Sequence, residues 1–234
     1  MPSNSGHEQG SPLRLSVIVP TLNEQAHLHA SLASVSLAPT DELIIVDGGS
    51  RDATQEIARQ FTPHVLDAPQ GRARQMNAGA RQSQGHVLLF LHADTQLPPG
   101  GLDSIRVVMR QHDITGGAFR LNLTPPTLGL RLVAWGANLR TRIGRLPYGD
   151  QALFIRRSLF KKIGGYADTP FLEDVQLVKA LRQNGKLAII PQAVMTSGRR
   201  WQDEGLIYTT VRNNVLMLLY GLGVSPATLK RWYR

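Results

Sequence analysis

Three acidic side chains stand directly after runs of apolar residues, and this placement suits them to hold a ligand. They are Glu24, Asp47 and Asp94. Carboxylates accept hydrogen bonds from riboses and bases. Mg²⁺-like cations also prefer oxygen ligands and often take only one or two carboxylates, with phosphate oxygens supplying the rest. Asp94 could be such a metal ligand, whereas Asp47 taken alone equally suits a turn or a helix cap.

A second set of chemically capable residues lies in the C-terminal half of the chain. Glu173 and Asp174 are adjacent, and carboxylates can act as general acids or bases. Acids are also favoured at helix N-termini, so the pair can alternatively be a feature of the helix that follows. Arg199 and Arg200 add positive charge, which could stabilise an anion.

Several common kinds of active site are excluded or disfavoured. The chain has no cysteine, which excludes disulfides, thiolate metal sites and cysteine nucleophiles. It has no P-loop, and Pro20 stands where a dinucleotide-binding glycine loop would follow the first apolar run. The stretch 48–52 nearly matches the nucleophile elbow G-x-S-x-G, but Asp52 replaces the closing glycine. A serine hydrolase is therefore disfavoured.

The elements that must position these residues alternate between strands and helices. Strands are predicted at 15–20, 43–46 and 87–91, and helices at 24–37, about 52–61 and 71–84. A strand near 114–121 and helices at 127–145, 171–183 and 207–220 are predicted to follow. Buried strands that alternate with helices indicate an open, mainly parallel α/β sheet with helices on both faces. Ligands bind at the carboxyl ends of such strands.

Composition and charge limit the class of protein. The 234 residues are 42% apolar and 18% charged, which is typical of a globular chain. The formal charge of +9 attracts polyanions, anionic lipid headgroups or phosphorylated small molecules. Nucleic acid is an unlikely partner because aromatic residues do not alternate with the basic ones. The polar N-terminus contains no apolar core of a secretory signal, so we expect a cytoplasmic protein.

Two segments raise the question of membrane contact. The apolar run 215–224 is about half the length that a spanning helix needs. The basic stretch 127–145 carries apolar residues at helical spacing, which are Leu128, Leu132, Trp135, Leu139, Ile143 and, just beyond the stretch, Leu146. Such a helix can lie in an anionic membrane interface on the inner face of the membrane, or it can pack this apolar stripe against the core. We favour the packing of this stripe against the core.

The motifs taken together resemble family 2 glycosyltransferases of the GT-A fold. The resemblance is carried by 16–24, 45–54 and 90–94, and it extends through 149–151, 171–174 and 199–201. It implies a tail at 1–13 and one catalytic domain at 14–234, with a nucleotide-binding half at about 14–100 and an acceptor-side half at about 101–234. It also implies an inverting enzyme that transfers a sugar from a nucleoside-diphosphate sugar, with a UDP-sugar favoured, to an unidentified small or lipid-linked acceptor.

The resemblance also implies roles for individual residues on the donor side. The predicted nucleotide-binding residues are Pro20, Thr21, Glu24, Asp47, Gly48, Arg72, His92 and Asp94. Asp94 matches the last acid of the family's D-x-D motif and would bind a divalent cation, Mg²⁺ or Mn²⁺. His92 replaces the first acid of that motif, and Gly48 replaces the second acid of the V-D-D-G-S turn.

On the acceptor side, the resemblance assigns the general base to Asp174. The residues predicted to face the acceptor or the diphosphate are Gly117, Asp150, Gln151, Glu173, Arg199, Arg200 and Trp201. Ser197 stands at the glutamine position of the Q-x-x-R-W motif, which argues against a processive synthase. Two alternatives remain at this point: a sugar-phosphate nucleotidyltransferase, and a nucleotide-sugar sensor without turnover.

Overall fold

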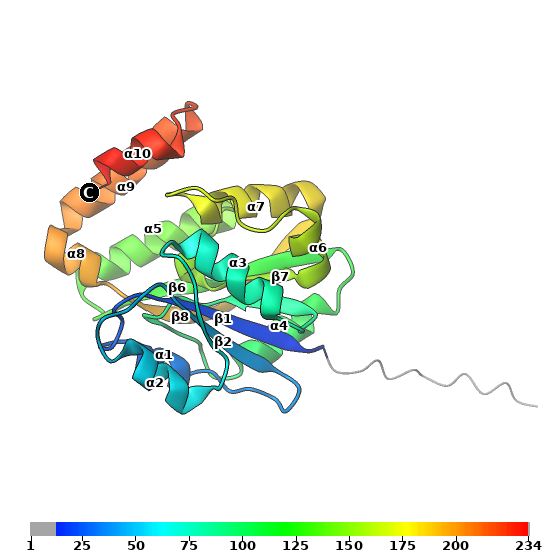
Figure 1. The fold of residues 1–234 in the computed structure, drawn as a ribbon. Coiled ribbons are helices and arrows are strands. Elements are labelled where there is room, and N and C mark those ends of the chain that lie inside the picture. Colours follow the sequence, from blue (N-terminus) through cyan, green and yellow to red (C-terminus); the bar gives the residue numbers. More distant parts are fainter. Residues whose placement is uncertain (1–12, 234) are drawn as a thin grey trace, which may run out of the picture.

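The computed structural model describes residues 13–233. The predicted tail therefore lies almost wholly outside the described residues. The predicted α/β class is confirmed, because eight strands form one sheet in the order β3-β2-β1-β4-β7-β6-β8-β5, and helices cover both of its faces (Figure 1). The strands are β1 Leu15–Thr21, β2 Glu42–Asp47, β3 Val65–Asp67, β4 Val87–Phe90, β5 Thr95–Gln96, β6 Ile114–Thr124, β7 Leu153–Arg156 and β8 Lys186–Ser197.

The helices that the sequence predicted are present, with shifts at their ends. They are α1 Leu28–Ala33, α2 Thr54–Phe61, α3 Arg72–Gln82, α4 Gly101–Met109, α5 Leu128–Gly144, α6 Arg157–Lys162, α7 Glu173–Asn184, α8 Arg199–Glu204, α9 Leu206–Gly221 and α10 Pro226–Trp232. A short 3-10 helix, Gly149–Gln151, precedes β7. The first helix is shorter than the predicted 24–37. Strands β3, β5, β7 and β8 and helices α6, α8 and α10 were not predicted.

Parallel pairing brings the first loops to one edge of the sheet. Strands β3, β2, β1 and β4 are parallel neighbours, and in this register Thr21 of β1 lies opposite Asp47 of β2. Strand β7 pairs antiparallel with both β4 and β6. The turn before β7 therefore lies at the same edge as the carboxyl end of β4, so the His92 and Asp94 loop meets the 3-10 helix there.

Alternate residues of the strands pack into two separate cores. In β1, Val17 and Val19 face the core under α1, α2, α4 and α5, whereas Ile18 faces the core under α3, α6 and α7. All three side chains are fully buried, as expected for strands that are covered on both faces. The burial of apolar residues on both sides explains why these strands read as continuous apolar runs in the sequence.

A third apolar cluster attaches the C-terminal helices to the start of α7. Leu172 and Val175, at the N-terminal end of α7, pack against Leu216 of α9 and Leu229 of α10. Figure 1 shows α9 and α10 side by side beyond one end of the sheet, close to α5 and α7. The cluster fixes the N-terminus of α7, which carries Glu173 and Asp174, relative to the end of the chain.

The predicted packing of the apolar stripe on α5 is wrong. Leu128, Leu132 and Ile143 are 79%, 64% and 76% exposed, and the buried residues of this helix include Leu130 and Ala134 instead. The helix presents a second, less apolar face to the sheet, which the spacing of the large residues alone did not indicate. Within the described residues, no helix is both long enough and apolar enough to cross a bilayer.

Candidate functional site

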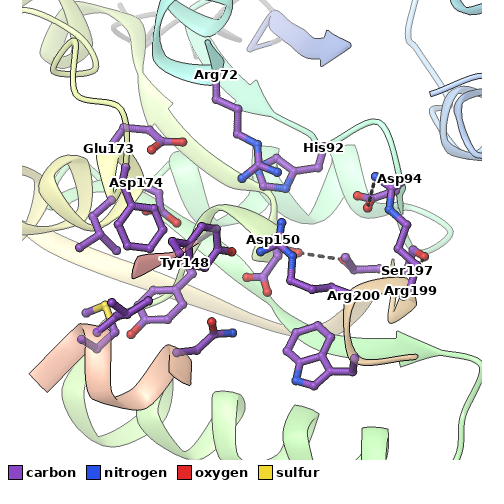
Figure 2. A pocket seen from close by; sticks show the side chains of 18 residues that line it. Arg72, His92, Asp94, Tyr148, Asp150, Glu173, Asp174, Ser197, Arg199 and Arg200 are labelled. Atoms are coloured by element: carbon purple, nitrogen blue, oxygen red, sulfur yellow. Dashed lines mark hydrogen bonds and ion pairs between the residues drawn. The ribbon is translucent and has the colours of Figure 1, made fainter. Parts of the chain in front are cut away.

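A cavity of about 200 Å³ lies where the β4 loop, the 3-10 helix, α7 and α8 meet, and we call it the central cavity (Figure 2). Segments far apart in the sequence contribute charged side chains to it. Of the predicted site residues it is lined by Arg72, His92, Asp94, Asp150, Glu173, Asp174, Arg199, Arg200 and Trp201. The structure therefore brings nine of the predicted residues together around one cavity.

A second depression of about 600 Å³ adjoins the central cavity at the carboxyl end of β1, and we call it the strand-end cleft. Pro20, Thr21 and Glu24 line it together with the N-terminal turn of α3. Five residues line both depressions, namely Arg72, Phe171, Glu173, Arg200 and Tyr233. A ligand can therefore extend from the end of β1 to the acidic pair without leaving the protein surface.

Local backbone geometry directs Asp174 into the central cavity. Leu172 adopts a left-handed conformation with φ of 62°, which costs a leucine about 1–3 kcal/mol. The apolar cluster around Leu172 offsets this cost. The turn allows α7 to begin at Glu173, and Asp174 Oδ2 then accepts a hydrogen bond of 2.7 Å from the Gly149 backbone N–H. The 3-10 helix and α7 thus hold the carboxylate from two sides.

Two polar groups of the site enclose Gly149 and leave no room for a side chain there. A Cβ atom at this position would lie 2.9 Å from His92 Nε2 and 3.3 Å from Asp174 Oδ2. Contacts under about 3.0 Å are essentially absent for real Cβ atoms. The absence of a side chain at Gly149 therefore lets the 3-10 helix pass between the β4 loop and the N-terminus of α7.

Two carboxyl groups beside Asp174 are less acidic than usual. Burial, followed by the neighbouring charge of Asp174, raises the pKa of Glu173, which is only 8% exposed. Burial raises the pKa of Asp150 to about 6; the nearby Arg140 opposes this effect, and Asp174 and Asp94 add to it. Three acids are therefore crowded around one cavity, and a cationic or hydrogen-bond-donating ligand would relieve their repulsion.

The raised pKa of Asp150 predicts that asparagine at this position stabilises the protein above pH 6. The folded protein retains the Asp150 proton up to about pH 6, whereas an unfolded aspartate releases it near pH 3.8. The free energy of unfolding of the wild-type protein therefore falls as the pH rises from about 4 to about 6. The decrease is up to about 3 kcal/mol, at roughly 1.4 kcal/mol per pKa unit. Asp150→Asn removes this loss.

Thermal unfolding of both proteins at pH 4.5 and pH 7.5 measures the effect. The melting temperature of Asp150→Asn relative to wild type should be higher at pH 7.5 than at pH 4.5. A difference that is independent of pH contradicts the assigned pKa.

Two guanidinium groups approach each other in the central cavity. Burial, and next the charge of Arg72, lower the pKa of Arg200. Within the described part of the chain, neither arginine has a carboxylate oxygen within 4 Å. His92 lies beside both (Figure 2), and burial together with Arg72 lowers its pKa to about 4. The imidazole is therefore neutral near pH 7, and the two guanidinium groups together could bind an anion.

Asp94 is paired with an arginine. The Arg199 guanidinium lies 3.3 Å from Asp94 Oδ2 and 2.6 Å from Glu24 Oε1, and Figure 2 shows Arg199 beside Asp94 at the edge of the cavity. No cluster of three or more histidine or acidic side chains suited to a metal is found among residues 13–233. A cation here would have Asp94 as its protein carboxylate and would need further oxygen ligands from a substrate.

Comparison with known proteins identifies the family. The chain matches the family described as Glycosyl transferase family 2 over residues 16–162, which is more than half of the 234 residues. The chain belongs to glycosyltransferase family 2. The match ends before α7, so the acidic pair Glu173 and Asp174 lies outside the matched segment.

Relatives and solved structures agree with the family and the fold. A PGL/p-HBAD biosynthesis glycosyltransferase of Mycobacterium bovis is 34% identical over 166 residues, covering 64% of this chain and 62% of the relative. S. aureus TarS in complex with UDP-GlcNAc has a TM-score of 0.63 at 17% identity, covering 79% of this chain and 58% of that chain. Glucosyl-3-phosphoglycerate synthase from Mycobacterium tuberculosis, in complex with Mg²⁺ and UDP, has a TM-score of 0.62 at 18% identity. This match covers 91% of this chain and 80% of that chain.

These likenesses confirm the GT-A fold that the motifs indicated. This chain spans about three fifths of the length of the curated mycobacterial relative.

Asp47, in the turn that resembles the V-D-D-G-S motif, does not line the central cavity. Asp47 is fully buried, and its carboxylate accepts hydrogen bonds from Thr21, Ser50 and Gln55 and from the backbone of the turn. Burial alone would raise the pKa of Asp47, but these hydrogen bonds outweigh it and lower the pKa. Asp47 thus lies outside the residues that line either depression, and its carboxylate holds the turn at the edge of the strand-end cleft. A contact of Asp47 with a nucleotide stays a prediction.

Gly48, Gly117 and Gln151 also serve packing rather than the cavity surface. A Cβ on Gly48 would lie 3.1 Å from the side-chain amide of Gln75, and one on Gly117 would lie 2.1 Å from the Ala188 carbonyl oxygen. Gln151 is fully buried and hydrogen-bonds Thr141 and the backbone of β6. The motif positions were located by the sequence, but the direction of these three groups depends on strand pairing and helix packing.

Several cavity residues were not anticipated from the sequence. Tyr148, Phe171, Asn213, Met217 and Tyr233 line the central cavity, and the last three come from α9 and the segment after α10. Tyr148 directly precedes the motif segment 149–151 and Phe171 is the first residue of the segment 171–174, so position in the sequence was a usable signal for these two. Nothing in the local sequence indicates that α9 and the C-terminal segment return to the site.

Proposed function

We propose that this family 2 protein transfers a sugar from a nucleoside-diphosphate sugar to a hydroxyl group of an acceptor, with inversion at the anomeric carbon. One observation carries the proposal. Among residues 13–233, the central cavity is lined by two guanidinium groups without a carboxylate partner, Arg72 and Arg200, and by a carboxylate that accepts a backbone hydrogen bond, Asp174. An anion site next to a general base is the arrangement that displacement of a diphosphate by a hydroxyl group requires.

The donor fits the two adjoining depressions. Pro20, Thr21 and Glu24 would face the nucleoside in the strand-end cleft, and Arg72 and Arg200, which line both depressions, would contact the diphosphate. A UDP-sugar is the favoured donor, since solved structures with this fold hold UDP-GlcNAc in TarS and UDP in the M. tuberculosis enzyme. The sugar would then lie toward Asp150 and Asp174.

The reaction forms one bond and breaks one. The acceptor oxygen bonds to the anomeric carbon on the face opposite the diphosphate, and the bond from that carbon to the phosphate oxygen breaks with its electron pair going to the diphosphate. The acceptor proton passes to the Asp174 carboxylate, which is a stronger base than a neutral hydroxyl group. Arg72 and Arg200 stabilise the charge that develops on the leaving diphosphate.

A divalent cation, Mg²⁺ or Mn²⁺, would be held by Asp94. The residues present fit such an ion, because a Mg²⁺-like cation commonly takes one or two carboxylates and completes its shell with phosphate oxygens and water. The cation would neutralise charge on the diphosphate. The Arg199 guanidinium pairs with Asp94 and also with Glu24, at 2.6 Å. Glu24 can therefore retain the guanidinium when Asp94 binds the cation.

The nucleotide-sugar sensor remains the second candidate. The pairing of Asp94 with Arg199 favours it, because an arginine can substitute for a cation in binding without assisting turnover. The nucleotidyltransferase gains no support, since Pro20 and Thr21 offer no basic glycine loop at the end of β1.

A calorimetric titration with UDP, GDP and dTDP, each with and without Mn²⁺, tests the proposed function. We expect UDP to bind, Mn²⁺ to strengthen its binding, and Asp94→Asn to remove the strengthening while binding without Mn²⁺ remains. Arg51→Gln, at an exposed position on the β2 loop, is the control. No heat with any of the three nucleotides contradicts the proposed function.

A further inference from the structure

An apolar groove of about 550 Å³ runs between α5 and α9 and opens on the protein surface. The two helices meet at Gly129, where an added Cβ would lie 2.5 Å from Leu206 Cδ2. Two turns further along α5, an added Cβ at Gly136 would meet nothing within 4 Å. The apolar side chains that line the groove include Leu132, Val133, Ala137, Ile207, Val211 and Met217.

The groove joins the central cavity at its inner end. Tyr148, Asp150, Trp201, Asn213 and Met217 line both spaces. At this junction two buried oxygens, Asp150 Oδ1 and Asn213 Oδ1, have no hydrogen-bond partner within residues 13–233. A buried acceptor left without a donor is destabilising. A ligand with hydroxyl groups at the junction would supply the missing donors.

The outer mouth of the groove is apolar as well. Leu132 on α5 and Ile207 and Val211 on α9 are 64%, 78% and 55% exposed. Concentrated exposed apolar surface commonly marks a site of interaction. The path from solvent to Asp174 along this route is therefore apolar at the surface and polar at the reacting centre.

We propose that the acceptor is an amphiphile whose apolar chain lies in the groove between α5 and α9, with its reacting hydroxyl group at the junction beside Asp150 and Asp174. This inference rests on the proposed function, and it specifies the class of acceptor. The geometry favours the single apolar chain of an acceptor molecule, because the groove leads inward to the central cavity. A flat bilayer surface or a second copy of the protein would contact only the outer rim of the groove.

Alkyl glucosides of different chain length provide the probe, and Trp201 provides the signal. The chain has three tryptophans, so Trp135→Phe with Trp232→Phe leaves Trp201, at the junction, as the only one. Burying one methylene strengthens binding roughly fourfold. Octyl glucoside, used below its micelle concentration, should therefore bind at least about tenfold more tightly than methyl glucoside, as read from the Trp201 emission.

Two pairs of variants locate the binding. Gly136→Phe should fill the open space on α5 and weaken octyl glucoside binding at least about tenfold, whereas Gly136→Ala changes the same helix position without filling the groove. Val211→Asp should weaken binding similarly by placing a charge on the groove wall. Val107→Asp, at a 62% exposed position on α4, makes the same substitution away from the groove and should leave binding unchanged.

UDP calorimetry on the same samples separates the two proposals. Three results together support the groove as the acceptor site. UDP binds to all variants, glucoside binding strengthens with chain length, and octyl glucoside binding is weakened in Gly136→Phe and Val211→Asp. UDP binding with no dependence on chain length overturns the amphiphilic acceptor and leaves the proposed function intact. Octyl glucoside binding that Gly136→Phe and Val211→Asp do not change, or binding only to anionic phosphatidylglycerol vesicles, also overturns it. If the wild-type protein does not bind UDP, both proposals are overturned.

Discussion

Asp174→Asn is expected to reduce sugar transfer by about 10²- to 10⁴-fold, the range that a general base contributes, without reducing UDP affinity more than about twofold. An asparagine keeps the shape of the side chain, and its single amide oxygen can accept the 2.7 Å hydrogen bond from the Gly149 backbone N–H in place of the one that Val175 N–H donates to Asp174 Oδ1. It cannot take the acceptor proton. UDP release from a UDP-sugar measures transfer, with octyl glucoside or water as the acceptor, and calorimetry measures affinity.

Asp103→Asn is the matched control for this experiment. Asp103 is an aspartate on α4, 80% exposed and paired with Arg106, and it lies outside the residues that line the cavities. An exposed ion pair contributes about 0–1 kcal/mol, so activity should stay near wild type. Turnover by Asp174→Asn that equals turnover by Asp103→Asn would remove Asp174 from the role of base.

Arg200→Gln is expected to weaken UDP binding about 10- to 100-fold, since a hydrogen bond to a charged group contributes about 1.5–3 kcal/mol. The same change should make the ligand-free protein more stable. Burial and then Arg72 lower the pKa of Arg200, which means that its charge is held in the folded protein at a cost. Glutamine removes that cost and keeps much of the side chain's length.

Calorimetry and thermal unfolding of the same preparation measure the two opposite effects. Arg110→Gln, at an exposed position at the end of α4, changes the net charge equally and should alter neither quantity. Equal loss of affinity in both variants would mean that UDP responds to the overall charge rather than to a local anion site. A lower melting temperature for Arg200→Gln would contradict the repulsion inferred between Arg200 and Arg72.

The sequence predicted the elements and the loops of the site more accurately than the direction of individual side chains. Strand β1 was predicted within one residue, because strands buried on both faces appear as uninterrupted apolar runs. Asp94 follows such a strand, Asp174 lies in the first turn of α7, and both line one cavity. Asp47 has the same placement, but the hydroxyl and amide donors around it bind its carboxylate inside the turn. Only the folded turn shows which of these outcomes applies.

The wrong prediction for the apolar stripe on α5 had a different cause. Spacing shows that Leu132 and Ile143 lie on one side of a helix, but it does not show whether that side meets the sheet. The structure directs this side outward, and the groove between α5 and α9 depends on that orientation. Contacts of α9 and the C-terminal segment with the site likewise depend on the cluster of Leu216 with the start of α7, a long-range contact that no local pattern contains.

The affinity of UDP relative to uridine tests the central claim most directly. If the nucleoside lies in the strand-end cleft and Arg72 and Arg200 bind the diphosphate, UDP binds at least about tenfold more tightly than uridine, since charged hydrogen bonds add about 1.5–3 kcal/mol each. In Arg72→Gln with Arg200→Gln, UDP affinity then falls to that of uridine, and uridine affinity does not change. Equal affinity of the wild-type protein for UDP and uridine, or an undiminished preference for UDP in the double variant, contradicts the account.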